Sequence, residues 1–209
     1  MSAGVLTRGV DRFENTRPAD RDWWRELWPE PVAVLAELGL EAGESVADAC
    51  CGDGHFAIPA AELVEPAPVY AVDVDGTLLD EIEARAVERG VENVVTVSGD
   101  VRELSSLLPE RVDVVLLANT FHGVEAPTAF AEQVFRSLQP GGRFLIVNWR
   151  DLPREETTVL GEPRGPPPAL RMTPEETRSA VAPAGFEVVR EVDLPPYHSG
   201  LVFRRAHDA

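Results

Sequence analysis

The sequence contains no lysine, so all 19 of its basic residues are arginine, and 36 acidic residues give it a net charge of −17. Such an acid excess argues against nucleic-acid binding, because carboxylates and phosphates repel each other, and no basic stripe interleaved with aromatic residues offsets it. A GC-rich genome replaces lysine by arginine but adds no acids. The two features together favour a cytoplasmic protein of a salt-loving cell, whose dense surface carboxylates keep it dissolved.

Cysteine is scarce as well, and long apolar runs are missing. The two cysteines, Cys50 and Cys51, are adjacent, so we expect reduced thiols and no disulfide framework. No apolar run approaches about 18 residues, so no membrane span is expected, and residues 1–15 lack the apolar core of a secretory signal. The four histidines show no paired ligand spacing, so we predict no metal site.

The length of 209 residues, with 44% hydrophobic and 26% charged residues, indicates one globular domain spanning residues 1–209. Residues 1–40 are expected to form an N-terminal helical cap that carries an aromatic stripe of Trp23, Trp24 and Trp28. From residue 45 onward, short apolar runs alternate with helical patterns, which is typical of a parallel sheet covered by helices on both faces. The predicted strands are residues 46–50, 69–72, 94–97, 112–117, 144–147, 186–192 and 201–205.

Residues 151–172 interrupt this alternation with five prolines and no periodicity. A stretch of this kind inside a compact domain is either disordered or a functional loop such as a lid. The connection at residues 195–200 between the last two predicted strands is short, which indicates an antiparallel hairpin.

The residues that carry chemistry follow the first three predicted strands. Gly52 and Gly54 allow a tight turn and close approach of a ligand to the backbone. Asp73 ends the second strand, where a carboxylate can accept hydrogen bonds from both hydroxyls of a ribose. Asp100 and Val101 follow the third strand, where a carboxylate and an amide can meet an adenine. Ligands of open α/β sheets bind at this carboxyl edge.

Other interpretations of these residues are open. Asp73 can be a solvated carboxylate, and Asp100 can simply cap the helix that begins at Val101. The loop from Gly52 to Ala57 also fits an NAD(P)-binding Rossmann oxidoreductase. That alternative explains neither the acid Asp48 inside the first strand nor the lack of a Tyr-x-x-x-Lys pair, which a chain without lysine cannot supply.

Taken together, Asp48 through Gly54, Asp73, Asp100, the strand into Asn119 and residues 138–142 resemble class I S-adenosyl-L-methionine (SAM)-dependent methyltransferases. The Cys-Cys-Gly-x-Gly form of the first motif is similar to that of the quinone-biosynthesis C-methyltransferases. The resemblance implies a Rossmann-like α/β fold, with a doubly wound seven-stranded sheet of order 3-2-1-4-5-7-6 whose seventh strand is antiparallel.

The resemblance also implies SAM as the cofactor. Asp48 and the glycine loop would hold its methionine end, Asp73 its ribose and Asp100 its adenine. The full set of implied cofactor-binding residues is Asp48, Cys50, Gly52, Gly54, Asp73, Val74, Asp100, Val101 and Asn119. One departure is that Cys50 stands where the family usually has the first glycine of the motif.

Methyl transfer is mainly a matter of alignment, so a general base is needed only if the acceptor must lose a proton. The candidates for such a base are His122, Tyr197 and His198. We expect a small apolar or aromatic acceptor, because the aromatic stripe, residues 151–172 and the Tyr197-His198 turn can close a mostly apolar pocket. Arg17 and Arg150 are either surface charges or anchors for an acidic acceptor or the SAM carboxylate. A SAM-binding protein without transferase activity is a further alternative.

Overall fold

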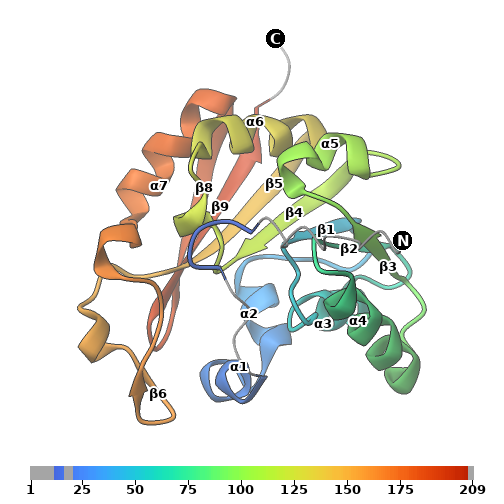
Figure 1. Ribbon diagram of the computed structural model, residues 1–209. Coiled ribbons are helices and arrows are strands. Elements are labelled where there is room, and N and C mark those ends of the chain that lie inside the picture. Colours follow the sequence, from blue (N-terminus) through green and yellow to red (C-terminus); the bar gives the residue numbers. More distant parts are fainter. Residues whose placement is uncertain (1–11, 17–20, 207–209) are drawn as a thin grey trace, which may run out of the picture.

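The computed structural model describes residues 12–16 and 21–206. A seven-stranded sheet crosses the centre of the molecule in the order β3-β2-β1-β4-β5-β9-β8 (Figure 1). Its strands are β1 (Val46–Ala49), β2 (Val69–Asp73), β3 (Val94–Ser98), β4 (Val112–Ala118), β5 (Leu138–Trp149), β8 (Phe186–Leu194) and β9 (His198–Arg205). Strands β1 to β5 pair in parallel, and β9 runs antiparallel to β5 and β8. Because β8 and β9 are the sixth and seventh strands of this sheet, the predicted order and the antiparallel seventh strand are confirmed.

Helices cover both faces of the sheet (Figure 1). They are α1 (Arg21–Leu27), α2 (Pro31–Glu37), α3 (Ala57–Val64), α4 (Gly76–Arg89), α5 (Leu104–Leu107), α6 (Pro127–Ser137) and α7 (Pro174–Val181). Successive residues of β1 point to opposite faces, so Val46 joins one buried apolar cluster and Ala47 joins another. The first cluster includes Leu35 of α2 and Ile58 of α3, and the second includes Phe130 of α6. This two-sided core is what the doubly wound pattern predicts.

Strand β5 begins six residues earlier than the sequence predicts. Leu138 already pairs with Val112, the register then shifts, and pairing resumes with Arg143 opposite Val114. The earlier start was not predicted, because residues 140–142 are Pro-Gly-Gly, which is typical of a turn. The carboxyl end of β5 carries Trp149 to the same edge of the sheet as the ends of β1, β2 and β4.

The proline-rich segment, residues 151–172, has a defined conformation. It contains a two-stranded hairpin of β6 (Thr158–Val159) and β7 (Glu162–Pro163) between two short 3-10 turns. The buried guanidinium of Arg171 stabilises the segment from inside. It donates hydrogen bonds to the backbone oxygens of Pro166 (3.1 Å), Arg164 (3.2 Å) and Arg150 (3.3 Å) and to the hydroxyl of Thr157 (2.9 Å).

Of the predicted N-terminal cap, residues 1–11 and 17–20 lie outside the described residues, and the candidate anchor Arg17 is among them. The described part comprises residues 12–16 and the helices α1 and α2, which are separated by the Pro29 to Pro31 break that the sequence indicates. No helix in the described part of the chain is long and apolar enough to cross a membrane.

Candidate functional site

A cavity of about 540 Å³ lies at the carboxyl edge of the parallel strands, the edge at which open α/β sheets bind ligands. Each of three successive β-α units contributes an acid to its lining: Asp48 in β1, Asp73 at the end of β2 and Asp100 after β3, and Asp53 of the glycine loop is a fourth. All the residues predicted to contact the cofactor line this cavity except Gly54. They are Asp48, Cys50, Gly52, Asp73, Val74, Asp100, Val101 and Asn119.

Gly54 lies beside the cavity rather than in its lining. Its φ is +79°, and a Cβ placed there would lie 2.8 Å from Cγ1 of Ile82 on α4. A glycine is therefore required so that the loop can turn and pack closely against α4. This packing accounts for Gly54 without any contact to a ligand.

The carboxylate of Asp73 organises the glycine loop and still has capacity for a ligand. Its Oδ2 accepts a hydrogen bond from the amide of Gly52 (3.0 Å), and its Oδ1 accepts one from the amide of Asp75 (2.9 Å). A carboxylate has about four lone-pair positions, so about two are left for donors in the cavity. Two adjacent hydroxyls of a ligand would supply two donors, one for each of these positions.

Asp100 has both of the roles that the sequence allows. Its Oδ1 accepts from the amide of Arg102 (2.9 Å), which caps the short helix that begins at Val101. Its Oδ2 pairs with the Arg102 guanidinium at 2.7 Å. Both Asp100 and Val101 nevertheless line the cavity, so capping and ligand contact are compatible.

Asp48 is a buried acid next to another acid. Burial, together with the nearby charge of Asp73, raises its pKa to about 8. Asn119 lies across the strand ends with a positive φ of 56°, and its side-chain oxygen is buried without a hydrogen-bond partner among the described residues. An oxygen acceptor that lacks a donor, and an acid that a nearby positive charge would ionise, both suit a cationic group in this cavity.

Aromatic side chains form another part of the cavity lining. Trp23 and Trp24 come from α1, and Trp149 comes from the end of β5. The ring centroids of Trp23 and Trp149 are 6.2 Å apart, and those of Trp23 and Trp24 are 5.4 Å apart. Trp28 differs from its neighbours because it is buried in the core. The predicted aromatic stripe therefore supplies both core packing and cavity lining.

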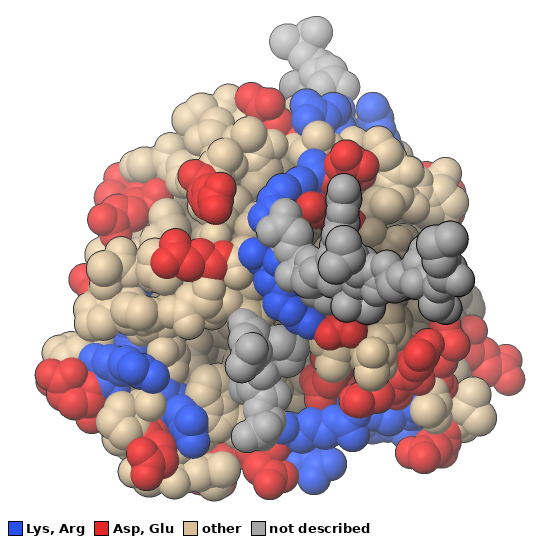
Figure 2. Space-filling view, viewed as in Figure 1, with Lys and Arg blue, Asp and Glu red and all other residues tan. Residues whose placement is uncertain are grey.

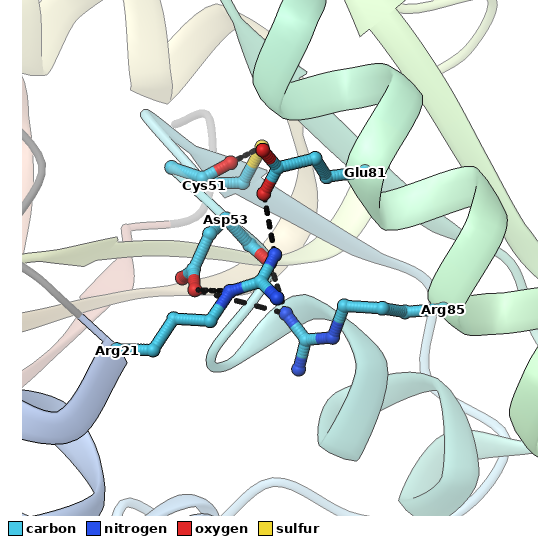
Figure 3. Close-up of polar contacts among 6 residues, drawn as sticks. Arg21, Cys51, Asp53, Glu81 and Arg85 are labelled. Carbon is cyan, nitrogen blue, oxygen red and sulfur yellow. Dashed lines mark hydrogen bonds and ion pairs between the residues drawn. The ribbon is translucent and has the colours of Figure 1, made fainter.

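Helix α1 is tied to the glycine loop by charged side chains (Figure 3). Arg21 pairs with Asp53 of the loop at 3.0 Å and also with Glu81 of α4. Arg85 of α4 donates to the backbone oxygen of Asp53. These contacts hold the tryptophans of α1 over the cavity.

Of the three predicted proton acceptors, only His122 lines the cavity. Its exposed fraction is 7%, its Nδ1 lies 3.2 Å from Oδ1 of Asn148, and its Nε2 lies 3.5 Å from the backbone oxygen of Asn15. Burial lowers its pKa, so the imidazole is neutral near pH 7. A neutral imidazole has one proton and one lone pair, and both nitrogens face oxygens here, so uptake of a proton from a ligand requires one of these two contacts to be replaced.

Tyr197 and His198 lie away from the cavity lining. The Tyr197 hydroxyl donates to the backbone oxygen of Thr158 (3.0 Å). His198 has an exposed fraction of 0%, and its ring lies 4.4 Å from Trp28 and 4.2 Å from Trp149, measured between centroids. Since β9 begins at His198 rather than at residue 201, this side chain points into the core. We propose no catalytic role for either residue.

Arg150, the other candidate anchor, is also engaged elsewhere. Its Nε donates to the backbone oxygen of His198 (3.0 Å), and its guanidinium pairs with Asp193. The sequence did not single out three lining residues that matter below, namely Trp149, Arg154 and Arg164. Trp149 follows a buried strand at the cofactor edge, and this position was a usable signal. The two arginines lie in a segment without periodicity and gave none.

Residues 40–175 match a family model described as a methyltransferase domain, and this stretch is well over half of the chain. The chain belongs to the methyltransferase domain family. A solved structure of a SAM-dependent methyltransferase from Aquifex aeolicus is 27% identical and superposes with a TM-score of 0.75 over 90% of this chain and 94% of that chain. The fold and these matches confirm the resemblance to class I SAM-dependent methyltransferases, whose cofactor is SAM.

Two curated relatives of this chain have quinones in their names. A demethylmenaquinone methyltransferase of Anoxybacillus flavithermus is 27% identical over 61% of this chain and 52% of its own length. A ubiquinone/menaquinone biosynthesis C-methyltransferase of Pseudomonas putida is 31% identical over 59% of this chain and 48% of its own length. The matched part thus spans about half of each relative. Family membership decides against the dinucleotide-binding oxidoreductase that the glycine loop alone allowed.

Family membership also explains the strain at Cys50. This residue has a positive φ of 58°, a conformation that glycine adopts without cost and that other residues adopt at roughly 1 kcal/mol. The family usually has glycine at this position. Burial raises the pKa of the Cys50 thiol, so the side chain is an uncharged lining group rather than a nucleophile.

Proposed function

We propose that this methyltransferase transfers the methyl group of SAM to a small, largely apolar or aromatic acceptor. The observation that carries the proposal is a single cavity lined by two kinds of side chain. Asp48, Asp73 and Asp100 form its carboxylate wall, and Trp23, Trp24 and Trp149 form its acceptor wall. A polar wall and an apolar wall in one enclosed space suit two ligands of different chemistry.

The carboxylate wall fits SAM by its donor set. The free lone pairs of Asp73 suit the two ribose hydroxyls, and Asp100 with Val101 suits the adenine. Asp48 and the unpartnered oxygen of Asn119 suit the positive charge of the methionine end. When bound, SAM supplies a methyl group activated by its sulfonium.

The chain's own residues would then align the acceptor, exclude water and receive a proton. The tryptophans of α1 and β5 cover the cavity and limit the access of water. If the acceptor atom carries a proton, the neutral His122 is the group in the lining that can take it up. Alignment of the two reactants is worth roughly 7–11 kcal/mol of the barrier, so the acceptor wall is as important as any base.

Calorimetric titration in high salt tests the proposal. SAM and S-adenosylhomocysteine should both bind, and Asp73→Ala should weaken both by roughly tenfold or more, since hydrogen bonds to a charged acceptor are lost. Asp80→Ala, an exposed acid on α4, is the matched control and should bind like the wild type. Thermal melts of each variant check that it is folded.

Two results would contradict the proposal in different ways. Tight binding of NADH without binding of SAM would favour an oxidoreductase. Binding of SAM without methyl transfer to any member of a broad panel of aromatic acceptors would favour a SAM-binding protein that has no transferase activity.

A further inference from the structure

The acids that line the cavity come from one part of the described chain, whereas arginines line it from several parts. Among the described residues, every acid in the lining comes from the first three β-α units: Asp48, Asp53, Asp73 and Asp100. The lining that comes from residues 149–172 contains no acid in the described structure, but it contains Arg154 and Arg164. In a chain with a net charge of −17, a wall whose charged groups are all positive calls for a physical reason.

These two arginines also differ from the other arginines of the lining in their partners. Arg12 pairs with Asp75, and Arg102 pairs with Asp100. Arg154 and Arg164 make no ion pair with any described residue. The Nε of Arg164 is buried without a hydrogen-bond partner in the described part of the chain. A buried donor of a charged group is costly unless a ligand satisfies it.

Arg164 is held in place at the aromatic wall. Its guanidinium carbon lies 5.4 Å from the ring centroid of Trp23, within the range of a cation–π contact. Its backbone amide donates to Thr157 (2.8 Å), and its backbone oxygen accepts from the buried Arg171 (3.2 Å). The neighbouring Gly165 has a φ of +86°, and a Cβ there would lie 2.8 Å from Trp149, so the proline-rich segment packs directly on that ring.

Arg164 thus lies beside Trp23, the segment that carries it packs on Trp149, and Arg154 lines the same cavity. Arginine gathers elsewhere too: Figure 2 shows arginine side chains along the middle of this face of the molecule, with acidic side chains mainly around its rim. A guanidinium binds a carboxylate through paired N–H donors, and a tryptophan face binds a planar ring. Together these side chains suit a ligand that has both a carboxylate and a planar ring.

We propose that the methyl acceptor is a small aromatic acid, whose ring lies against Trp23 and Trp149 and whose carboxylate is bound by Arg164 with Arg154. This inference rests on the proposed function and specifies its substrate class. It gives the cavity a balanced charge pattern, because the cationic cofactor meets the acids and the anionic acceptor meets the arginines. The competing use of these arginines is to bind the carboxylate of SAM itself.

Calorimetry on the full chain saturated with S-adenosylhomocysteine separates these possibilities. The probes are benzoate, 4-hydroxybenzoate and indole-3-carboxylate, each compared with its own carboxamide at one fixed KCl concentration. At least one acid should bind roughly tenfold more tightly than its amide, as a charge-assisted pair predicts. In Arg164→Gln, and further in the double variant with Arg154→Gln, this preference should fall to about threefold or less, with the affinity for S-adenosylhomocysteine unchanged.

Arg204→Gln, an exposed arginine of β9 outside the lining, is the matched control and should keep the preference. Equal binding of every acid and its amide, or no binding of any probe, overturns the inference. A marked loss of S-adenosylhomocysteine affinity in Arg164→Gln also overturns it and assigns the arginine to the cofactor. Failure of the wild type to bind S-adenosylhomocysteine appears in the first titration and contradicts the proposed function itself.

Discussion

The raised pKa of Asp48 predicts that cofactor binding is linked to release of a proton. With a pKa of about 8 in the free protein, this carboxyl is about 1% ionised at pH 6 and about a tenth ionised at pH 7. A positively charged methionine end favours the ionised form. If Asp48 is ionised in the complex, the affinity for S-adenosylhomocysteine rises roughly ninefold from pH 6 to pH 7, and about 0.9 proton is released per molecule bound at pH 7.

The free energy of unfolding depends on pH in the opposite direction, which provides a second measurement. The folded-state pKa of Asp48 lies above its unfolded value of 3.8, so the folded state binds more protons between about pH 4 and pH 8. Asp48 therefore makes its full contribution to the free energy of unfolding below pH 4, and this contribution is lost as the pH rises to about 8. Without ligand, Asp48→Asn should reduce this decline while keeping a similar side-chain shape.

Titration calorimetry in two buffers of different ionisation enthalpy measures the proton directly. The range from pH 6 to pH 7 is chosen because the α-amino group of the ligand, with a pKa of about 8, stays charged there. Asp48→Asn is the control and should change in affinity by no more than about twofold over this range. A wild-type affinity that does not change with pH, or an Asn variant with the same slope as the wild type, would refute the reasoning.

Three further predictions concern other parts of the molecule. His122→Asn should lower the rate of methyl transfer by about 100-fold or more if this residue accepts the proton, and its affinity for S-adenosylhomocysteine should stay the same; an equal loss of both would show a structural role. Arg171→Leu leaves several backbone oxygens of the proline-rich segment without a donor, so the free energy of unfolding should fall by about 3 kcal/mol. Amide hydrogen exchange should also become faster within residues 151–172. Unchanged exchange there would mean that other contacts hold the segment. Thermal melts should rise from dilute to molar KCl, because salt screens the repulsion among surface carboxylates; a flat response would leave base composition as the only explanation for the missing lysine.

The carboxylate wall could be predicted because it follows from topology alone. Asp48, Asp73 and Asp100 belong to successive parallel strands, and the carboxyl ends of such strands meet at one edge of the sheet. The hairpin that closes the sheet was equally local, because the short connection between β8 and β9 requires antiparallel pairing.

The sequence indicated that the tryptophans of α1 and residues 151–172 help to close the pocket. It did not indicate Arg154 and Arg164, because their places in the lining depend on contacts between distant residues. Arg164 reaches the cavity only because the buried Arg171 and the close packing of Gly165 on Trp149 fix the proline-rich segment there. The position of His198, a candidate proton acceptor that lies outside the cavity lining, was not predicted either. One strand boundary decides the direction of its side chain, and the observed strand starts three residues earlier than the apolar pattern indicates.

A crystal structure with S-adenosylhomocysteine bound shows directly whether the carboxylate wall holds the cofactor. The ribose hydroxyls should lie on Asp73, the adenine beside Asp100 and Val101, and the sulfur should face the space between His122 and Trp149. A nucleoside outside the carboxylate wall, or a methionine carboxylate seated on Arg164, would contradict this placement.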